Sequence, residues 1–306
     1  MPSIPWTSDT VVNAVLNDSA NLEIVLSNYF KSFIVRMGDY DINLQEINST
    51  NSLSEKVLQG IEDLEKMRKE FISVVEIFAP SKHKLLAEYL PTFFENLLTS
   101  YEENGINLYT GTSVDVLRND HYRFFNQFLF ISLTSLLLEN ECFDILAKVL
   151  HSKFMVFNRS YGKIFEQNFV HFQRYNYTLN QNLNAGAKRL SVTADYMLNY
   201  SDESKFDRLV RADILLYYIS LWYHTDDIFG SHWFPELSVY NRNVQVLPMM
   251  VSKAYFDQAK VLFGVNTVEE YKRLLKDTKE TIDRGVAQRV PMLPDGLLYD
   301  TVATLD

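Results

Sequence analysis

The sequence is poor in the residues that break helices and in the residue that forms disulfides. A chain of 306 residues contains one cysteine, 10 glycines and 8 prolines. A single cysteine excludes a disulfide within the chain and a zinc site built on cysteines. Few glycines and prolines, together with 21 phenylalanines and 18 tyrosines, argue against a turn-rich β fold and favour long helices.

Several signature motifs are also missing. Neither GxxxxGK[ST] nor GxGxxG occurs, and strands do not alternate with helices, which disfavours a P-loop or Rossmann fold. No GxSxG elbow occurs, and the six histidines are dispersed along the chain. The longest apolar stretch, 124–138, is interrupted by polar residues and is shorter than the roughly 20 apolar residues of a membrane helix. The start of the chain has no signal-peptide pattern, so we expect a soluble protein.

Basic residues are fewer than acidic ones. The chain has 29 Lys and Arg against 39 Asp and Glu, a net charge of −10. An acidic surface repels phosphate backbones, so nucleic-acid binding is disfavoured. Acidic neighbours of Cys142 predict a raised pKa for its thiol and therefore low reactivity. This use of cysteine is typical of the cytoplasm, and no motif indicates a cofactor.

Helical periodicity runs through most of the chain and predicts an all-α fold. Helices are expected over 52–78, where Ser52 and Glu55 fit a capping box, and over 82–101. The segment 120–138 is apolar on all sides, which predicts a buried central helix. A helix is expected to start at Ser252, and a second capping box is expected at Thr267 with Glu270.

Less regular segments complete this picture. The aromatic spacing over 161–172 predicts a further helix, and residues 237–247 are the place for one small β-hairpin, with 241–243 as its turn. We expect one helical unit over 1–306. The alternative is a division into an N-terminal part, 1–102, and a C-terminal part, 113–306.

Residues 222–236 hold the densest group of chemically versatile side chains. Imidazoles and carboxylates that could hold a divalent metal ion follow one another here: His224, Asp226, Asp227 and His232. Their HxDDx₄H spacing matches no established metal motif. The structural alternative is a turn after a helix, with Trp233 and Phe234 returning to the core.

The segment Arg118–Arg123 precedes and opens the expected central helix. Asn119 or Asp120 fits its N-cap. Arg123 then falls in the first turn, where a positive charge opposes the helix dipole. We expect an acidic partner for Arg123. The alternative is an anionic ligand held by Arg118, His121 and Arg123 at the helix N-terminus.

The stretch 151–175 is the one basic island, with aromatic residues interleaved. Its candidate ligand-binding residues are Arg159, Lys163, Arg174 and Tyr175. Such a patch could hold a nucleotide or stack bases. Alternatively, the aromatic residues face the core and the basic residues form a solvated face.

Four segments, 118–140, 212–224, 233–240 and 252–275, resemble large helical accessory modules encoded in prokaryotic anti-phage defence loci. In such proteins the helical region accompanies a separate effector, such as a TIR- or SIR2-type domain or a nuclease. The resemblance implies a sensing, scaffolding or oligomerising role. It concerns layout, so it transfers no functional residue, and the effector would lie in a partner or in another portion of a longer polypeptide.

Three functions remain open on the sequence. The leading hypothesis is a non-enzymatic interaction or sensor module whose partner is another protein chain or a second copy of itself. The second is a small-ligand or nucleotide-binding protein that uses the basic residues above. The third is a metal-dependent enzyme centred on His224 and His232.

Overall fold

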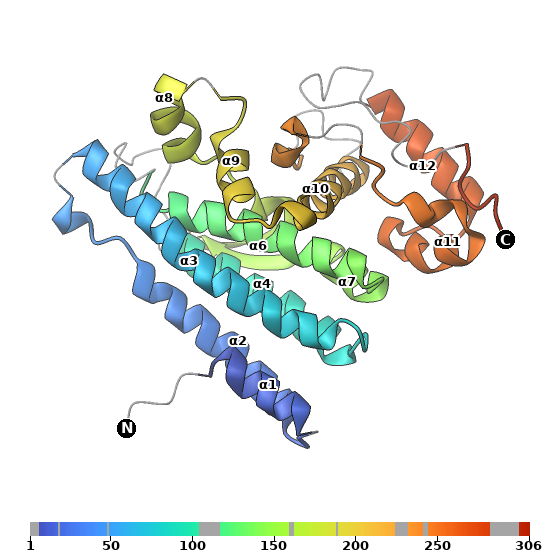
Figure 1. The fold of residues 1–306 in the computed structure, drawn as a ribbon, viewed down its shortest axis with the longest axis horizontal. Coiled ribbons are helices and arrows are strands. Elements are labelled where there is room, and N and C mark those ends of the chain that lie inside the picture. Colours follow the sequence, from blue (N-terminus) through green and yellow to red (C-terminus); the bar gives the residue numbers. More distant parts are fainter. Residues whose placement is uncertain are drawn as a thin grey trace.

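The computed structural model describes residues 6–17, 19–47, 49–103, 117–158, 162–187, 189–223, 232–240, 244–281 and 300–306. These residues are helical apart from one small hairpin, which confirms the all-α fold (Figure 1). The α-helices are α1 (Ser8–Leu16), α2 (Leu22–Met37), α3 (Thr50–Phe78), α4 (Lys84–Glu103), α6 (Asp120–Glu139), α7 (Phe143–Leu150), α8 (Asn184–Ala187), α9 (Val192–Asn199), α10 (Glu203–Tyr223), α11 (Lys253–Ala259) and α12 (Val268–Thr281).

Helix α6 lies at the centre of the molecule. It packs against α3 on one side and α10 on another, and α7 continues from its end (Figure 1). Nearly every side chain of α6 is buried, including those of Asn126, Gln127 and Thr134. The apolar residues on all sides of this segment therefore correctly predicted that it is the buried central helix.

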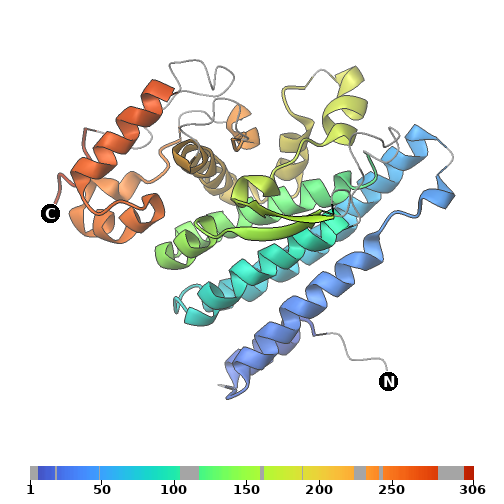
Figure 2. The ribbon, with the colours of Figure 1, turned by 180° about the vertical axis from the view of Figure 1, so that it is seen from behind.

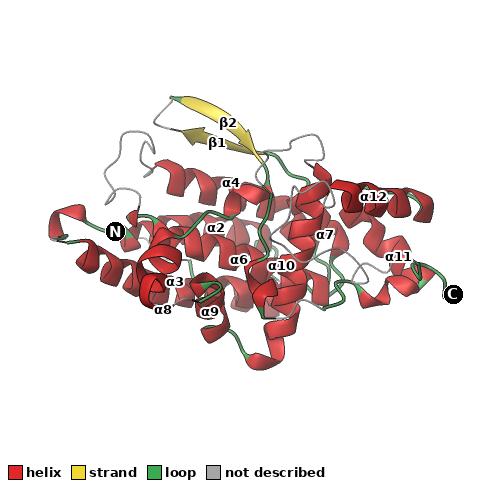
Figure 3. Ribbon diagram, turned by 90° about the horizontal axis from the view of Figure 1, so that it is seen from above, coloured by secondary structure: helices red, strands yellow, loops and turns green. Residues whose placement is uncertain are grey.

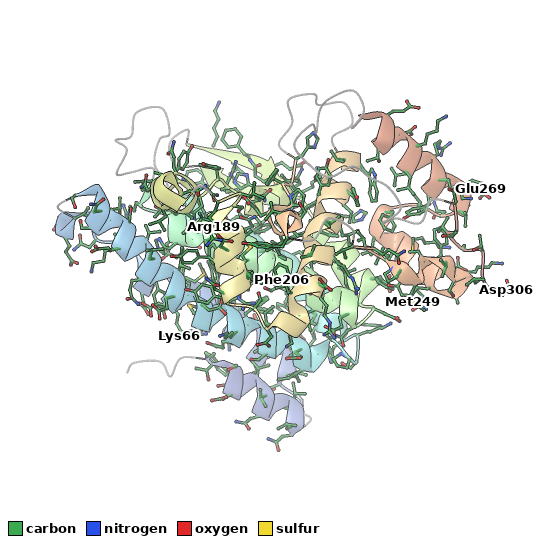
Figure 4. The ribbon with its side chains drawn as sticks, turned by 45° about the horizontal axis from the view of Figure 1, so that its top comes forward. Lys66, Arg189, Phe206, Met249, Glu269 and Asp306 are labelled. Carbon is green, nitrogen blue, oxygen red and sulfur yellow. The ribbon has the colours of Figure 1, made fainter. Side chains whose placement is uncertain are left out.

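The outer elements cover this centre at both ends. Helices α1 and α2 pack together, with α1 also against α3 and α2 against α4. At the other end, α12 packs against α10, and the last residues return to the body beside α11. There the amide of Ala303 donates to Met250 O (2.8 Å) and that of Leu305 to Val251 O (2.9 Å). In Figure 4, Met249, Glu269 and Asp306 lie together at this end, far from Lys66 on α3.

Short helical turns join the longer helices. They are 3₁₀ helices at Gly38–Tyr40, Leu44–Glu46, Phe169–Phe172, Glu236–Val239, Pro248–Val251 and Lys260–Phe263, and a π-helical turn at Thr178–Leu183. Gly264 ends the sixth of these as a C-terminal cap in the left-handed conformation (φ 63°, ψ 25°), which favours glycine.

The hairpin is formed by β1 (Phe154–Asn158) and β2 (Lys163–Gln167), not by residues 237–247. Residues 236–239 form a 3₁₀ helix, and 241–243 lie outside the described residues. The helix expected over 161–172 is also wrong, because β2 and a 3₁₀ helix occupy its described part. Gly162 has a φ of 59°, a conformation that favours glycine and allows the chain to reverse here. The hairpin lies along α4 on the face seen in Figure 2, and the view from above shows it at the edge of the molecule (Figure 3).

Helix α3 begins earlier than the sequence predicted. Ser49 is the N-cap: its hydroxyl accepts from the amide of Ser52 (3.1 Å), and the amide of Ser49 donates to the Ser52 hydroxyl (3.2 Å). Ser52 therefore occupies the third position of the capping box, which the prediction had given to Glu55. The helix start at Ser252 and the cap at Thr267 are confirmed, since the hydroxyls of these residues accept from the amides of Tyr255 and Glu270.

Buried apolar side chains form one connected cluster from Val11 to Val302. Both parts of the alternative two-part division contribute to it, because α3 packs against α6. Among the helices that the structure describes, none combines the length and the apolar character of a bilayer-spanning segment.

Candidate binding surfaces

Asp120 organises the N-terminus of α6. Its buried carboxylate accepts from Arg123 Nη1 (2.6 Å) and from the amide of Thr178 (2.6 Å). Its backbone carbonyl accepts from Asn176 Nδ2 (2.7 Å). Burial raises the pKa of Asp120, and the Arg123 guanidinium opposes that shift. The acidic partner predicted for Arg123 is therefore present, and it ties α6 to residues 176–178.

His121 faces the core, not a surface. Its ring is fully buried against Gly60 of α3, and Nε2 lies 3.1 Å from Tyr40 O. Burial lowers its pKa to about 4, so the imidazole is neutral at pH 7. Arg118 is half-buried one turn before it. A neutral, enclosed imidazole gives an anionic ligand no charge, so within this set only the two arginines could do so.

The basic island is divided between two elements. Lys163 begins β2 and is exposed. Arg174 follows the 3₁₀ helix 169–172, and its Nη2 donates to the ring of His171, 2.8 Å from Nε2. Tyr175 is exposed and packs edge-on against Tyr177, with ring centroids 4.8 Å apart. Arg159 lies outside the described residues. A shared ligand site for these four residues stays a prediction.

Three of the four candidate metal ligands, His224, Asp226 and Asp227, lie outside the described residues. His232 is half-buried at the start of the segment 232–240. In the ranges that the structure describes, no group of three His, Cys, Asp or Glu side chains is placed to hold a metal ion. The metal site at 224–232 stays a prediction.

The segment after His232 is fixed to α10 by Asp213. The fully buried carboxylate of Asp213 accepts from Trp233 Nε1 (2.7 Å) and from the amide of Leu237 (2.8 Å). Burial raises its pKa to about 8. Trp233 therefore returns to the core as expected, whereas Phe234 is 40% exposed.

The hairpin presents an apolar surface to solvent. Met155, Phe157 and Ile164 are 49%, 37% and 61% exposed. They share one face, because Phe157 pairs with Ile164 across the strands and Met155 is two residues from Phe157. We call these three residues the hairpin patch. Phe154 and Val156 point the other way and are buried.

Among the described residues, no strand lies along the outer edge of the hairpin. Strand β1 lies next to α4, and the amide of Met155 donates to Glu95 Oε2 of that helix (2.7 Å). Within the described residues, β2 pairs with β1 on one side only. This hairpin was not predicted, although the apolar run 154–157, the polar residues that lead to Gly162 and the apolar pair at 164–165 are typical hairpin signals.

A cleft lies where α3, α6 and the start of α10 meet. Its volume is about 530 Å³, and we call it the α6 cleft. Its walls include Ile72 of α3, Leu136 of α6 and Leu209 of α10.

Arg68 forms part of the α6 cleft and is held rigidly. Nε and Nη2 each donate to the Glu65 carboxylate at 2.6 Å, and Nη1 donates to the Ser132 hydroxyl (2.8 Å). The guanidinium carbon lies 4.0 Å from the centroid of the Phe128 ring. Both charged side chains are largely buried. A buried ion pair with well-formed hydrogen bonds keeps a single geometry.

Neither a scan against protein-family models nor searches of the curated proteins and of the solved structures finds a match to this chain.

Proposed function

We propose that the chain is a non-enzymatic interaction module that binds an extended segment of another protein at the open edge of its hairpin. The hairpin patch is the observation that carries this proposal. Exposed apolar side chains that gather on one face are typical of interaction sites. Their exposure to water is unfavourable, and burying them against a partner contributes favourable free energy to binding.

The open edge of β2 supports the same proposal. A strand edge offers backbone N–H and C=O groups, which an added strand can pair with. The side chains of Ile164 and Glu166 alternate with those of Phe165 and Gln167 along this edge. An added strand with alternating apolar side chains would therefore pair its backbone with β2 and place its side chains against the hairpin patch.

The resemblance to accessory modules of anti-phage defence loci fits this role. In such a system the chain would act as a sensor or scaffold, and the bound segment would belong to the effector. The charge of −10 directs the choice of partner towards a protein with a neutral or basic segment, because like charges repel.

A photo-crosslinking experiment tests the proposal. A photoreactive phenylalanine analogue replaces Ile164 in the full chain, produced in its native host. The same replacement at Val35 of α2, which is 76% exposed, is the matched control. We expect a crosslinked product of defined mass from position 164 and none from position 35.

The charged variant Ile164→Asp should remove the same partner from the purified protein, as seen by native mass spectrometry. Uncrosslinked monomer at both positions would contradict the proposal. A crosslinked dimer of this chain would show that the bound segment belongs to a second copy of the chain and not to another protein.

A further inference from the structure

The α6 cleft has the features of a small-molecule site, and it is separate from the hairpin. Its volume of about 530 Å³ falls within the range of ligand pockets, roughly 300–1,000 Å³. Its apolar wall is formed by Ile72, Pro80, Leu136 and Leu209, and polar and charged side chains make up most of the remaining lining. Such a site can hold the apolar body of a ligand against one wall and orient its polar group with a few of the polar side chains.

Arg68 offers a donor to this cleft. A guanidinium has five N–H groups. The contacts with Glu65 and Ser132 use three of them, and a fourth lies 3.5 Å from Tyr200 O. In the part of the chain that the structure describes, the fifth, on Nη1, makes no hydrogen bond. The stacking on Phe128 fixes its direction.

Ser135 offers a second donor. It lies one turn after Ser132 on the same face of α6, and both line the cleft. The Ser132 hydroxyl is occupied, because it donates to Phe128 O (2.7 Å) and accepts from Arg68. The Ser135 hydroxyl makes no such bond with the described residues, so it can turn towards a ligand.

The charges around the cleft limit what it can bind. Glu65 already balances much of the Arg68 charge, and Arg208 is paired with Glu139. Glu76 and Asp202 also line the cleft. Together with Lys69 and Lys205, which also line the cleft, these charges balance, so the cleft offers no excess of positive charge to hold a dianion. One monoanionic group could share the Arg68 N–H and the Ser135 hydroxyl.

We propose that the α6 cleft binds a small monocarboxylate with an apolar body. The carboxylate accepts from Arg68 Nη1 and from the Ser135 hydroxyl. The apolar body contacts Ile72, Leu136 and Leu209. Lys69 and Lys205 line the same cleft and attract the ligand, with an effect that falls as salt concentration rises.

The test uses the full chain and four simple probes: benzoate, acetate, benzyl alcohol and phenyl phosphate. A ligand that binds only the folded state raises the melting temperature. At about 10 mM probe, a concentration suited to weak binding, we expect benzoate to raise it most. Acetate lacks the apolar ring, benzyl alcohol lacks the negative charge, and phenyl phosphate carries a second negative charge, so each of the three should raise the melting temperature less than benzoate does. No shift with benzoate, or a larger shift with phenyl phosphate, would overturn the proposal.

Two variants locate the site. Ser135→Ala removes one hydrogen bond, and we expect benzoate to bind about 3- to 10-fold more weakly. Ile72→Trp fills the cleft and should abolish binding. The controls are Ser100→Ala on α4 and Ile24→Trp on α2, which make the same changes outside the cleft. Unchanged benzoate affinity in both cleft variants would place the ligand elsewhere and overturn the proposal.

Discussion

The contact between Gly60 and His121 shows how closely α3 and α6 approach. A Cβ added at Gly60 would lie 3.0 Å from two ring carbons of His121. The imidazole is fully buried. An alanine at position 60 would therefore require the ring to shift by a few tenths of an ångström, and the neutral ring fills the space that glycine leaves.

We expect Gly60→Ala to destabilise the protein by about 1–3 kcal/mol, the range for overpacking a core. Urea unfolding measures the change. Gly38→Ala is the control, because Gly38 has φ −60° and ψ −20° and an added Cβ would meet nothing within 4 Å. That control should be neutral or stabilising by about 0.4–1 kcal/mol. Equal effects of the two substitutions would contradict the packing argument.

Asp213 predicts a pH dependence of stability. Its pKa is about 8 in the folded protein and near 3.8 when exposed, because burial disfavours the carboxylate. At a pH between these two pKa values, Asp213 therefore keeps its proton in the folded state and has lost it in the unfolded state. The contribution of Asp213 to stability is full below about pH 4 and is lost as the pH rises to about 8.

Asp213→Asn removes this titration and keeps one acceptor for Trp233 or Leu237. We expect the difference in the free energy of unfolding, wild type minus variant, to fall by about 1 kcal/mol per pH unit between pH 5 and 8. Urea unfolding at several pH values measures it. A difference that stays constant or rises with pH would show that Asp213 ionises normally in the folded protein.

At the scale of elements, the N-terminus of α3 depends on a reciprocal pair of serines. Ser49→Ala removes the acceptor of the Ser52 amide, and we expect a loss of about 1 kcal/mol. Ser73→Ala lies on the same helix, where the hydroxyl donates to the backbone carbonyl of Glu70, and should change stability little. Thermal unfolding distinguishes the two. An equal effect would contradict the capping role.

The elements also show which local signals can be read from sequence. The buried helix α6 was predictable, because its apolar residues surround the axis. The predicted start of α3 was two residues too late. Ser49 with Ser52 and Ser52 with Glu55 both fit a capping box, and the sequence alone does not decide between them. The hairpin was misplaced because the aromatic residues between 161 and 172 have a spacing that suits either a helix or a strand followed by a turn.

The candidate sites were harder to predict than the fold. Arg123 was correctly given an acidic partner, since a cation in the first helical turn needs one. The hairpin patch depends on which face of β1 meets α4, and the α6 cleft depends on side chains from three helices that are distant in sequence. Pairings between distant elements leave no trace in local periodicity, so neither surface could be derived from one sequence.

At the scale of the whole molecule, the two sides of the division near residues 103–112 depend on each other. Arg68 of α3 reaches Ser132 of α6, and the buried face of α3 meets α6 along its length. We expect the fragment 1–102 to lack fixed tertiary packing when it is produced alone. Near-UV circular dichroism and dispersion of amide proton shifts measure this. A well-dispersed spectrum would show that residues 1–102 form an independent domain.

The burial of α6 from all sides has a consequence for synthesis on the ribosome. The residues that cover one of its faces, in α10, leave the exit tunnel about 80 residues after α6 itself, at a rate of about 5–20 residues per second. For several seconds the nascent chain therefore carries an apolar helix without its cover. Ribosome-bound chains that end between α6 and α10 should be the stage at which chaperones bind most strongly, and the first at which the chain aggregates when they are absent.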